Sequence, residues 1–336
     1  MKEKTCLALF SGGLDSLLAI KLMMMNGFKV IVLNFNTGFY FNAYRREGGE
    51  LYYKAPVPPG FDVRVIDISG DFLQMLKNPA HGFGKNMNPC IDCKIYMLRK
   101  AGELMEKFGA GFVITGEVLG QRPMTQNIRA IKLIEKESGL SGYLLRPLSA
   151  KCLAPTEPEK AGWVDREKLF DIQGRTRKRQ LALAAGWGLS PFVKPPGGGC
   201  ILTEKAYSKR LRNFLERAGS ADITEDDMKL LRTGRHFIKD GAGFITGRNE
   251  EENRFLSGFR GKAVIFEARG APGPVTITFD NPGEEIKNFI AAVTAGYSDA
   301  RNLAEAVVEV LPPAPEPGGL LKVKPVLPEK AKEYFI

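Results

Sequence analysis

The chain has 336 residues, of which 44% are apolar, and this is enough to bury a sizeable core in two or three domains. Its five cysteines are an odd number for a disulfide framework, and its formal charge of +10 favours a polyanionic partner. No run of about 18 apolar residues appears, and the first four residues lead straight into a predicted strand. We therefore expect a cytoplasmic protein with reduced thiols or metal ligands and no membrane partner.

A glycine turn near the N-terminus joins a predicted strand to a predicted helix. Residues 6–10 are apolar, residues 11–16 read Ser-Gly-Gly-Leu-Asp-Ser, and residues 17–25 form a long apolar run with one lysine. Glycines let backbone N–H groups approach a ligand, and a helix N-terminus attracts anions. The serines can donate hydroxyls to phosphate, and Asp15 can cap the helix or reach a phosphate-bound cation. The turn predicts a phosphate site made by Ser11, Gly12, Gly13, Asp15 and Ser16.

This turn lacks the lysine that follows the glycines in P-loop NTPases. Residues 11–16 instead resemble, residue for residue, the Ser-Gly-Gly-x-Asp-Ser signature of the PP-loop ATP pyrophosphatases. The resemblance implies an adenine nucleotide alpha hydrolase-like fold that binds ATP with Mg²⁺ and transfers AMP to a carbonyl oxygen.

Further strands are expected at residues 29–35, 61–68, 112–117 and 143–148, with helices between several of them. This alternation predicts an α/β fold with a doubly wound parallel sheet whose ligand lies at the carboxyl ends of the strands. The Thr-Gly-Glu at residues 115–117 resembles the turn by which the family approaches its nucleotide. That resemblance makes Gly116 and Gln121 candidate ATP contacts.

Two other features lie along this sheet. The connection at residues 37–60 is longer than usual and is interpreted as a flexible lid or, preferably, an insertion with a short helix. Arg146, at the end of the last predicted strand, offers a planar fork suited to phosphate.

Cysteines gather in a two-plus-one pattern. Cys90 and Cys93 open a helix predicted over residues 95–108, where the helix dipole should lower their thiol pKa values. Cys200 ends a glycine-rich stretch far downstream. The pair alone is compatible with a redox dithiol, half of a metal or cluster site, or two buried thiols.

Three cysteines leave a fourth coordination position open. A structural zinc site needs four protein ligands, and the chain has only His81 and His236 to offer as histidines. An iron–sulfur cluster with three thiolates would leave one iron free for an exogenous sulfur. The pattern resembles the three-cysteine tRNA thiouridine synthetases, including 4-thiouridine and 2-thiouridine synthetases. This implies a [4Fe-4S] cluster on Cys90, Cys93 and Cys200, which would be catalytic together with Asp15; Zn²⁺, or a Cys200 persulfide without metal, are the alternatives.

Positive charge concentrates in one segment, because residues 151–217 hold 14 basic and 7 acidic side chains. A basic first helical turn opposes the helix dipole, and bound phosphates would offset that cost. With the thiolation motifs present, we expect RNA backbone contacts from Arg175, Arg177, Lys178, Arg179, Lys209 and Arg210.

A smaller α+β domain is expected near the C-terminus, with strands at about residues 235–238, 244–249, 263–267 and 275–279 before a helix that begins near Glu284. Residues 247–253 and 270–274 resemble an NFACT-type RNA-associated domain. His236 is expected to be a strand histidine with satisfied hydrogen bonds or one facing solvent, not a catalyst. The proline-rich end suits an extended strap.

The sequence thus divides into an ATP-binding domain (1–150), a basic helical region with Cys200 (151–220), an NFACT-like domain (221–310) and a proline-rich tail (311–336). The expected function is ATP-dependent tRNA thiolation, with tRNA and a sulfur donor (sulfide or a cysteine desulfurase) as partners and a homodimer as one assembly. Alternatives are a PP-loop enzyme acting on a small molecule with structural zinc, or an RNA-binding adaptor.

Overall fold

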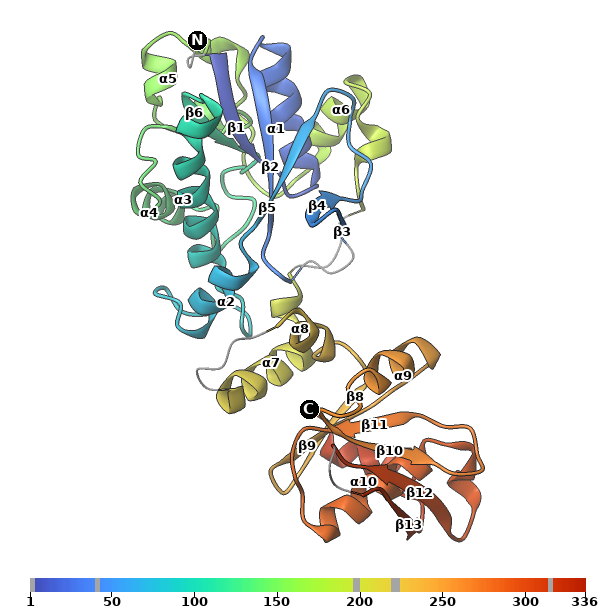
Figure 1. Ribbon diagram of the computed structural model, residues 1–336. Helices are drawn as coiled ribbons and strands as arrows, with labels where there is room; N and C mark the ends of the chain where they lie inside the picture. The colour runs from blue at the N-terminus through green and yellow to red at the C-terminus, as the bar shows by residue number, and fades with distance from the viewer. Residues whose placement is uncertain (1–3, 40–42, 196–199, 219–223, 314–316) are drawn as a thin grey trace. The chain divides into compact units, whose positions relative to one another are not determined.

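The computed structural model describes residues 4–39, 43–195, 200–218, 224–313 and 317–336 (Figure 1). The chain folds into two compact units, residues 1–208 and residues 209–336. No helix in the described ranges is long and apolar enough to cross a membrane.

The first unit is built on a five-stranded parallel sheet in the order β5-β2-β1-β6-β7. Its strands are β1 (Thr5–Leu9), β2 (Lys29–Asn36), β5 (Asp62–Asp67), β6 (Phe112–Thr115) and β7 (Leu144–Leu145). Ala8 of β1 lies opposite Val32 of β2 and Ile114 of β6, and all three are buried. The continuous apolar character of these strands follows from their burial on both faces.

Helices cover both faces of this sheet (Figure 1). Helix α1 (Leu14–Met25) packs with α6 (Lys178–Gly186) on one face, while α3 (Cys90–Phe108) packs with α2 (Ser69–Lys77) and α4 (Ile128–Glu137) on the other. In α3 the buried Ile95, Leu98 and Ala101 recur at three-residue steps, and Gly109 ends the helix in a left-handed conformation (φ 61°). The doubly wound parallel sheet predicted from the sequence is confirmed. The remaining short helical segments of this unit are α5 (Glu157–Lys160), Ala150–Cys152, Arg166–Lys168, Ser190–Phe192 and Ile201–Thr203.

The order of the strands reverses between β1 and β6. From β1 the chain passes to β2 on one side, whereas β6, on the other side, comes more than a hundred residues later. Ligands of open α/β sheets bind outside the carboxyl ends of strands at such a switch point. The turns after β1 and β6 both lie at this position.

The long connection after β2 forms a hairpin of β3 (Tyr44–Glu47) and β4 (Glu50–Tyr53). Gly48 and Gly49 both have positive φ and supply its tight turn. The expectation of a short helix is therefore wrong for the described part of this connection, and the alternative of a lid stays a prediction; residues 40–42 lie outside the described residues. Strand alternation was hard to see because most of the hairpin is exposed and mixes charged with aromatic residues.

The second unit holds a six-stranded antiparallel sheet in the order β13-β12-β10-β11-β9-β8. Helix α10 (Glu284–Gly296) buries its Ile290 and Val293 in a core shared with Phe237 and Phe266. This matches the predicted α+β domain. The other elements are β8 (Arg235–Lys239), β9 (Ala242–Thr246), β10 (Val264–Ala268), β11 (Val275–Thr278), β12 (Ala306–Leu311), β13 (Gly319–Val323), α8 (Glu225–Leu230), α9 (Glu250–Ser257), α11 (Pro328–Ala331), Asp299–Asn302 and Lys332–Tyr334. Helix α7 (Lys205–Ala218) contains the boundary between the units.

The proline-rich end is not an extended strap. Strand β13 pairs antiparallel with β12, placing Val308 opposite Leu321, and Val323 is buried. A Cβ on Gly296 would collide with the carbonyl of Val326, so the chain after β13 lies directly on α10. The described prolines of this end, Pro312, Pro313, Pro317, Pro325 and Pro328, stand outside the strands, where no ladder N–H is needed; Pro315 lies outside the described residues.

Candidate nucleotide and thiol site

The turn after β1 has the geometry of an anion cradle. Gly12 adopts φ +72°, and α1 begins two residues later without any side-chain cap. The Ser16 hydroxyl donates to the Gly13 carbonyl at 2.8 Å and lies 3.4 Å from the Ser11 hydroxyl. An uncapped helix N-terminus beside two hydroxyls is suited to a phosphate group.

Gly116 brings the end of β6 against this turn. A Cβ at Gly116 would collide with the backbone of Asp15 and Ser16, so no other residue fits there without displacing the turn. The first turn of α1 and the end of β6 therefore form one continuous surface.

Asp15 lies at the centre of a polar chain. Gln121 Nε2 donates to Asp15 Oδ2 at 2.6 Å, and Gln180 Nε2 of α6 donates to Gln121 Oε1 at 3.1 Å. Gln180 is fully buried. Burial raises the pKa of Asp15, although Gln121, Arg177 and Arg122 oppose the shift.

Three buried polar atoms around Asp15 have no hydrogen-bond partner among the residues that the structure describes: Asp15 Oδ1, Gln180 Oε1 and Arg177 Nε. Such atoms cost free energy unless a ligand or water satisfies them. A cation at the carboxylate and an anion at the guanidinium would do so, and a phosphate-bound Mg²⁺ fits this set of atoms. The sequence pointed to Asp15 and Gln121 but assigned Arg177 to RNA, and Gln180 carried no motif at all.

An ion network continues from Gly116 towards the cysteine helix. The neighbouring Glu117 is 3% exposed and accepts from Arg146 Nε at 3.2 Å, while Lys94 Nζ lies 3.2 Å from its other oxygen. Burial would raise the pKa of Glu117, but Lys94 and Arg146 together hold it below its usual value. Arg146, only 2% exposed, also pairs with Glu135 at 3.0 Å, so its expected role in binding phosphate is corrected to a structural one.

The three cysteines lie on two segments that are distant in the sequence but hydrogen-bonded to each other. Cys90 begins α3 and its thiol donates to Asn88 Oδ1 at 2.8 Å. The Met87 N–H donates to the Leu202 carbonyl at 3.1 Å, and Asn86 Nδ2 donates to the Thr203 carbonyl at 2.7 Å. Cys200, which immediately precedes this second segment, is thereby held near the start of α3.

The three thiols affect one another electrostatically. Burial raises the pKa of Cys93 to about 12, with Cys200 and Cys90 adding to the shift and Lys94 opposing it. Burial also raises the pKa of Cys200, and Cys90 contributes. The expected lowering by the helix dipole is therefore wrong for Cys93, because loss of solvation outweighs the dipole.

The part of the chain that the structure describes contains no group of three His, Cys, Asp or Glu residues arranged to hold a metal ion. His81 cannot serve as a fourth ligand, because its Nδ1 lies 3.1 Å from Asp92 and its Nε2 lies 3.3 Å from Glu137. Three thiols lie within electrostatic reach of one another, one fewer than the four protein ligands of a closed zinc site.

Comparison with known proteins identifies both ends of the chain. The family described as "Thiamine biosynthesis protein (ThiI)" matches residues 2–151, which hold the glycine turn, Gly116 and the Cys90–Cys93 pair. Residues 2–151 are a ThiI-family domain. The family described as "NFACT protein RNA binding domain" matches residues 234–335. The resemblances to PP-loop thiouridine synthetases and to an NFACT-type domain are confirmed.

Curated relatives of the ThiI-family domain carry related names. A "Probable tRNA sulfurtransferase" from Methanosarcina mazei is 32% identical over 34% of this chain and 28% of its own length. One of the same name from Thermococcus kodakarensis is 28% identical over 49% of this chain and 39% of its own. The "tRNA-specific 2-thiouridylase MnmA" of Geotalea uraniireducens is 24% identical over 77% of this chain and 66% of its own length. The chain thus spans less than two thirds of each of these relatives.

The predicted RNA-binding residues fall in both units. Beside the ThiI-family domain, Arg175, Lys178 and Arg179 are all exposed, and Arg179 pairs with Asp171 at 2.5 Å and lies over the Phe170 ring. In the second unit, Lys209 Nζ donates to the Phe335 carbonyl at 3.4 Å. The structure places Arg177 next to Asp15 rather than on the same exposed surface.

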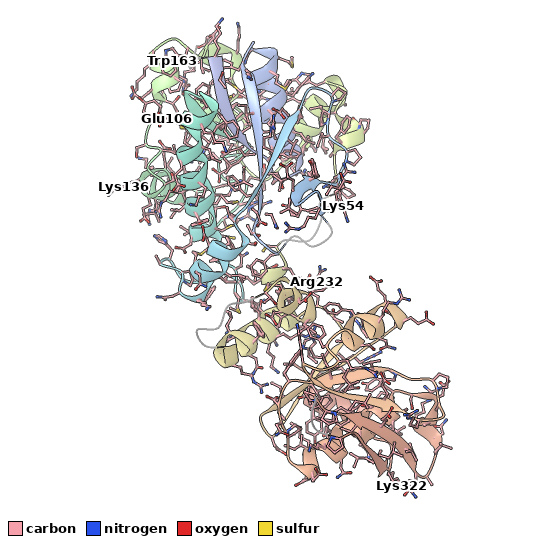
Figure 2. The ribbon with its side chains drawn as sticks, in the orientation of Figure 1. Lys54, Glu106, Lys136, Trp163, Arg232 and Lys322 are labelled. Atoms are coloured by element: carbon pink, nitrogen blue, oxygen red, sulfur yellow. The ribbon has the colours of Figure 1, made fainter. Side chains whose placement is uncertain are left out.

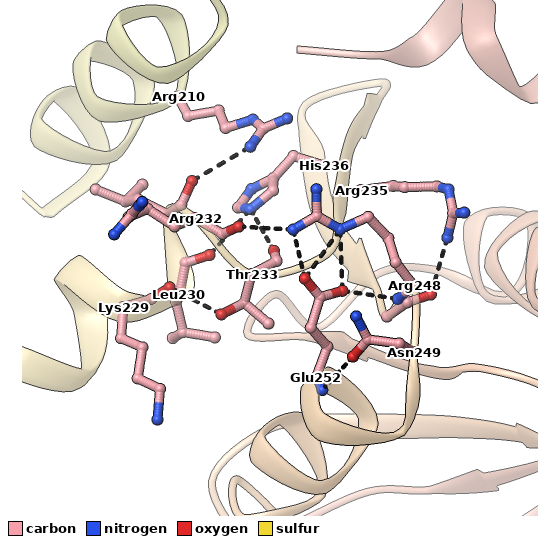
Figure 3. Close-up of polar contacts among 12 residues, drawn as sticks. Arg210, Lys229, Leu230, Arg232, Thr233, Arg235, His236, Arg248, Asn249 and Glu252 are labelled. Carbon is pink, nitrogen blue, oxygen red and sulfur yellow. Dashed lines mark hydrogen bonds and ion pairs between the residues drawn. The ribbon is translucent and has the colours of Figure 1, made fainter. Parts of the chain in front are cut away.

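Arginines converge at the start of the NFACT-type domain (Figure 3). We call Arg210, Arg232, Arg235 and Arg248 the arginine cluster; Arg210 and Arg248 act electrostatically on His236, while the Arg235 side chain extends away from it. Arg248 Nε contacts both oxygens of Glu252, at 2.9 and 3.0 Å.

Two other members of the arginine cluster, Arg210 and Arg235, contact neutral groups. Arg210 Nη1 donates to the Leu231 carbonyl at 3.3 Å, and Arg235 Nη1 donates to the Gly247 carbonyl at 2.9 Å. The Arg235 guanidinium also lies 4.6 Å from the centre of the Tyr297 ring. These contacts fix the arginines without neutralising them.

Like charges inside the cluster influence each other. Burial and Arg248 lower the pKa of Arg210. Burial, then Arg210, lower the pKa of His236 to about 3, and its Nε2 lies 3.0 Å from the carbonyl oxygens of Leu230 and Thr233. His236 is thus a buried neutral histidine, as expected, and the excess positive charge around it suits an anionic ligand.

Proposed function

We propose that this protein is an ATP-dependent tRNA thiolase that adenylates a uridine carbonyl and replaces its oxygen with sulfur. One observation carries the proposal: the phosphate turn and the cysteine helix are joined by a continuous chain of contacts. Gly116 lies on the backbone of Asp15, the adjacent Glu117 pairs with Lys94, and Lys94 follows Cys93. An activated carbonyl at the turn would therefore form beside the thiols.

The names of the relatives support the same reaction class. Two are called tRNA sulfurtransferases and one a tRNA-specific 2-thiouridylase. The matched RNA-binding domain supports an RNA substrate.

In the proposed first step the uridine carbonyl oxygen attacks the α-phosphorus of ATP, and pyrophosphate leaves. The turn at residues 11–16 offers N–H groups and hydroxyls to the phosphates, and Asp15 would hold the Mg²⁺ through its unpartnered Oδ1. Arg177 would satisfy its Nε on a phosphate oxygen. Charge that develops on phosphorus would then meet groups already in place.

In the second step a sulfur nucleophile attacks the adenylated carbon, and AMP leaves with the original oxygen. Cys90, Cys93 and Cys200 would hold a [4Fe-4S] cluster, whose chemistry when bound is to present an exogenous sulfur at an open iron. Because burial raises the pKa values of Cys93 and Cys200, both thiols must lose their protons to become ligands. Lys94, which lowers the pKa of Cys93, favours that loss.

The alternative sulfur route needs no metal: a Cys200 persulfide supplies the sulfur and Cys93 closes a disulfide with Cys200, which a reductant must later open. Iron analysis separates the routes. Protein prepared without oxygen should contain about four irons per chain with broad charge-transfer absorption. Iron-free protein that retains full thiolation activity rules out the cluster.

Substrate class is tested in cells. Mass spectrometry of tRNA nucleosides should show one thiouridine that disappears when the gene is deleted and returns with the intact gene but not with a Cys200→Ser variant. An unchanged nucleoside profile, with zinc near one per chain, would favour a PP-loop enzyme acting on a small molecule.

A further inference from the structure

Two side chains from distant parts of the sequence meet over Gly12. The Tyr53 hydroxyl lies 2.3 Å from the position that a Cβ on Gly12 would take, and Lys194 Nζ lies 3.3 Å from the same point. Lys194 Nζ donates to the Tyr53 hydroxyl at 2.8 Å and lies 5.2 Å from the centre of its ring. Neither residue belongs to a motif in the sequence.

Packing fixes the tyrosine at this position. Tyr53 ends β4 and meets Phe10 edge-on at 5.6 Å and Tyr44 at 6.4 Å. The Tyr44 hydroxyl in turn donates to Asn34 Oδ1 of β2 at 2.8 Å. The hairpin is therefore anchored to the sheet, and its last residue reaches the phosphate turn.

Lys194 has no carboxylate partner among the residues that the structure describes, and its side chain is exposed. The residues before it, Phe192 and Val193, pack against the core of the first unit. An ammonium group that is positioned by a hydroxyl and not neutralised by an acid is suited to an anion.

The two flanks of the phosphate turn differ. Gly116, Glu117 and the cysteine helix approach from the β6 side, whereas the hairpin that carries Tyr53 is anchored to β2 and β5. The α-phosphate must face the flank with the thiols, because the adenylated carbonyl reacts there. The departing phosphates then face Tyr53 and Lys194.

We propose that Lys194, held by Tyr53, binds the β- and γ-phosphates of ATP and stabilises the pyrophosphate that leaves. This inference rests on the proposed function, in that the turn binds ATP. P-loop NTPases place a lysine inside the loop itself. Here the glycine turn has none, and a lysine far downstream supplies the charge.

Calorimetric titration of the full-length protein with Mg·ATP, pyrophosphate and AMP tests the assignment. Lys194→Met should weaken ATP and pyrophosphate binding by about tenfold or more, the worth of one charge-assisted hydrogen bond, and leave AMP binding within about twofold. Lys194→Arg should recover part of the loss. Tyr53→Phe keeps the ring packing and should weaken ATP and pyrophosphate binding less than Lys194→Met does.

Lys54 supplies the matched control, because it follows Tyr53, is exposed and carries the same charge (Figure 2). Lys54→Met should bind all three ligands as the unaltered protein does. Equal losses for AMP and pyrophosphate in Lys194→Met, or no loss for pyrophosphate, would overturn the proposal. Failure of the unaltered protein to bind ATP and pyrophosphate overturns both the assignment and the proposed function; normal binding without thiouridine overturns the function alone.

Discussion

The phosphate turn of the ThiI-family domain and the arginine cluster of the second unit are two anion-facing regions built by different means. At the turn, Gly116 packs directly on backbone, and burial raises the pKa of the Asp15 carboxyl. In the arginine cluster, burial and then like charges lower the pKa values of Arg210 and His236, and Glu252 contacts Arg248 through both of its oxygens.

This difference separates two kinds of recognition. A surface made of backbone N–H groups depends on shape, so it selects a small ligand and tolerates little change in its geometry. A surface made of guanidinium groups depends on net charge, so it accepts a long polyanion and weakens with salt. The first suits ATP, and the second suits an RNA backbone.

The largest effect is expected from one methyl group at the turn. Gly116→Ala places a Cβ against the backbone of Asp15 and Ser16, so we expect about 1–3 kcal/mol of lost stability and loss of measurable ATP binding. Gly70→Ala in α2 is the control, because a Cβ there meets nothing within 4 Å and alanine favours helix. Urea unfolding measures the stability of the two variants, and calorimetry measures their ATP binding. Normal ATP affinity in Gly116→Ala would show that shape does not govern the turn.

Asp15→Asn should separate stability from binding. Burial raises the folded-state pKa of Asp15, so the ionised carboxylate is unfavourable and stability falls as pH rises through its titration range. The amide removes that cost, and we expect a slightly higher melting temperature at pH 7 without ligand. Mg·ATP binding should fall at least about tenfold, since a metal ligand is lost. A lower melting temperature with normal ATP binding would contradict both parts.

Acid should unfold the second unit through His236. Its folded pKa of about 3 lies below its ordinary 6.5, so the unfolded state takes up a proton first and stability is lost as pH falls below 6.5 towards 3. Both tryptophans, Trp163 and Trp187, lie in the first unit. Circular dichroism should therefore change in acid before tryptophan fluorescence does, and His236→Gln should reduce the difference. Simultaneous transitions would argue against a role for His236.

The smallest effects are expected in the arginine cluster. Arg248→Gln should lower tRNA affinity several-fold and reduce the slope of log affinity against log salt by about one. Glu252→Gln removes the carboxylate that Arg248 contacts. This variant should bind tRNA more tightly and have a steeper slope of log affinity against log salt. Filter binding at several salt concentrations measures the slopes. Identical slopes in both variants would show that RNA binds elsewhere.

Local patterns were sufficient to predict the phosphate turn and the parallel sheet. The apolar runs of β1 and β2 and the Ser-Gly-Gly turn need only short-range information, because each is set by residues within one element. The partners of Asp15 and Gly12 were not predictable in this way. Gln180 and Lys194 reach the turn through packing of elements that the sequence separates widely, and no spacing records that contact.

Two other features could not be predicted because they depend on the assembled fold. The sequence placed Cys93 correctly at a helix N-terminus, but the loss of solvation that reverses its pKa shift depends on what covers it in the fold. In β13, neighbouring prolines concealed a strand whose pairing with β12 becomes visible only when the sheet is assembled.

Coupling between the phosphate turn and the thiols is central to the proposed reaction. Purified protein given tRNA, Mg·ATP and sulfide should release AMP and form thiouridine in equal amounts. Cys200→Ser should lose thiouridine formation while it still binds Mg·ATP with unchanged affinity. Thiouridine formation at the normal rate in Cys200→Ser, or in the absence of ATP, would contradict the account.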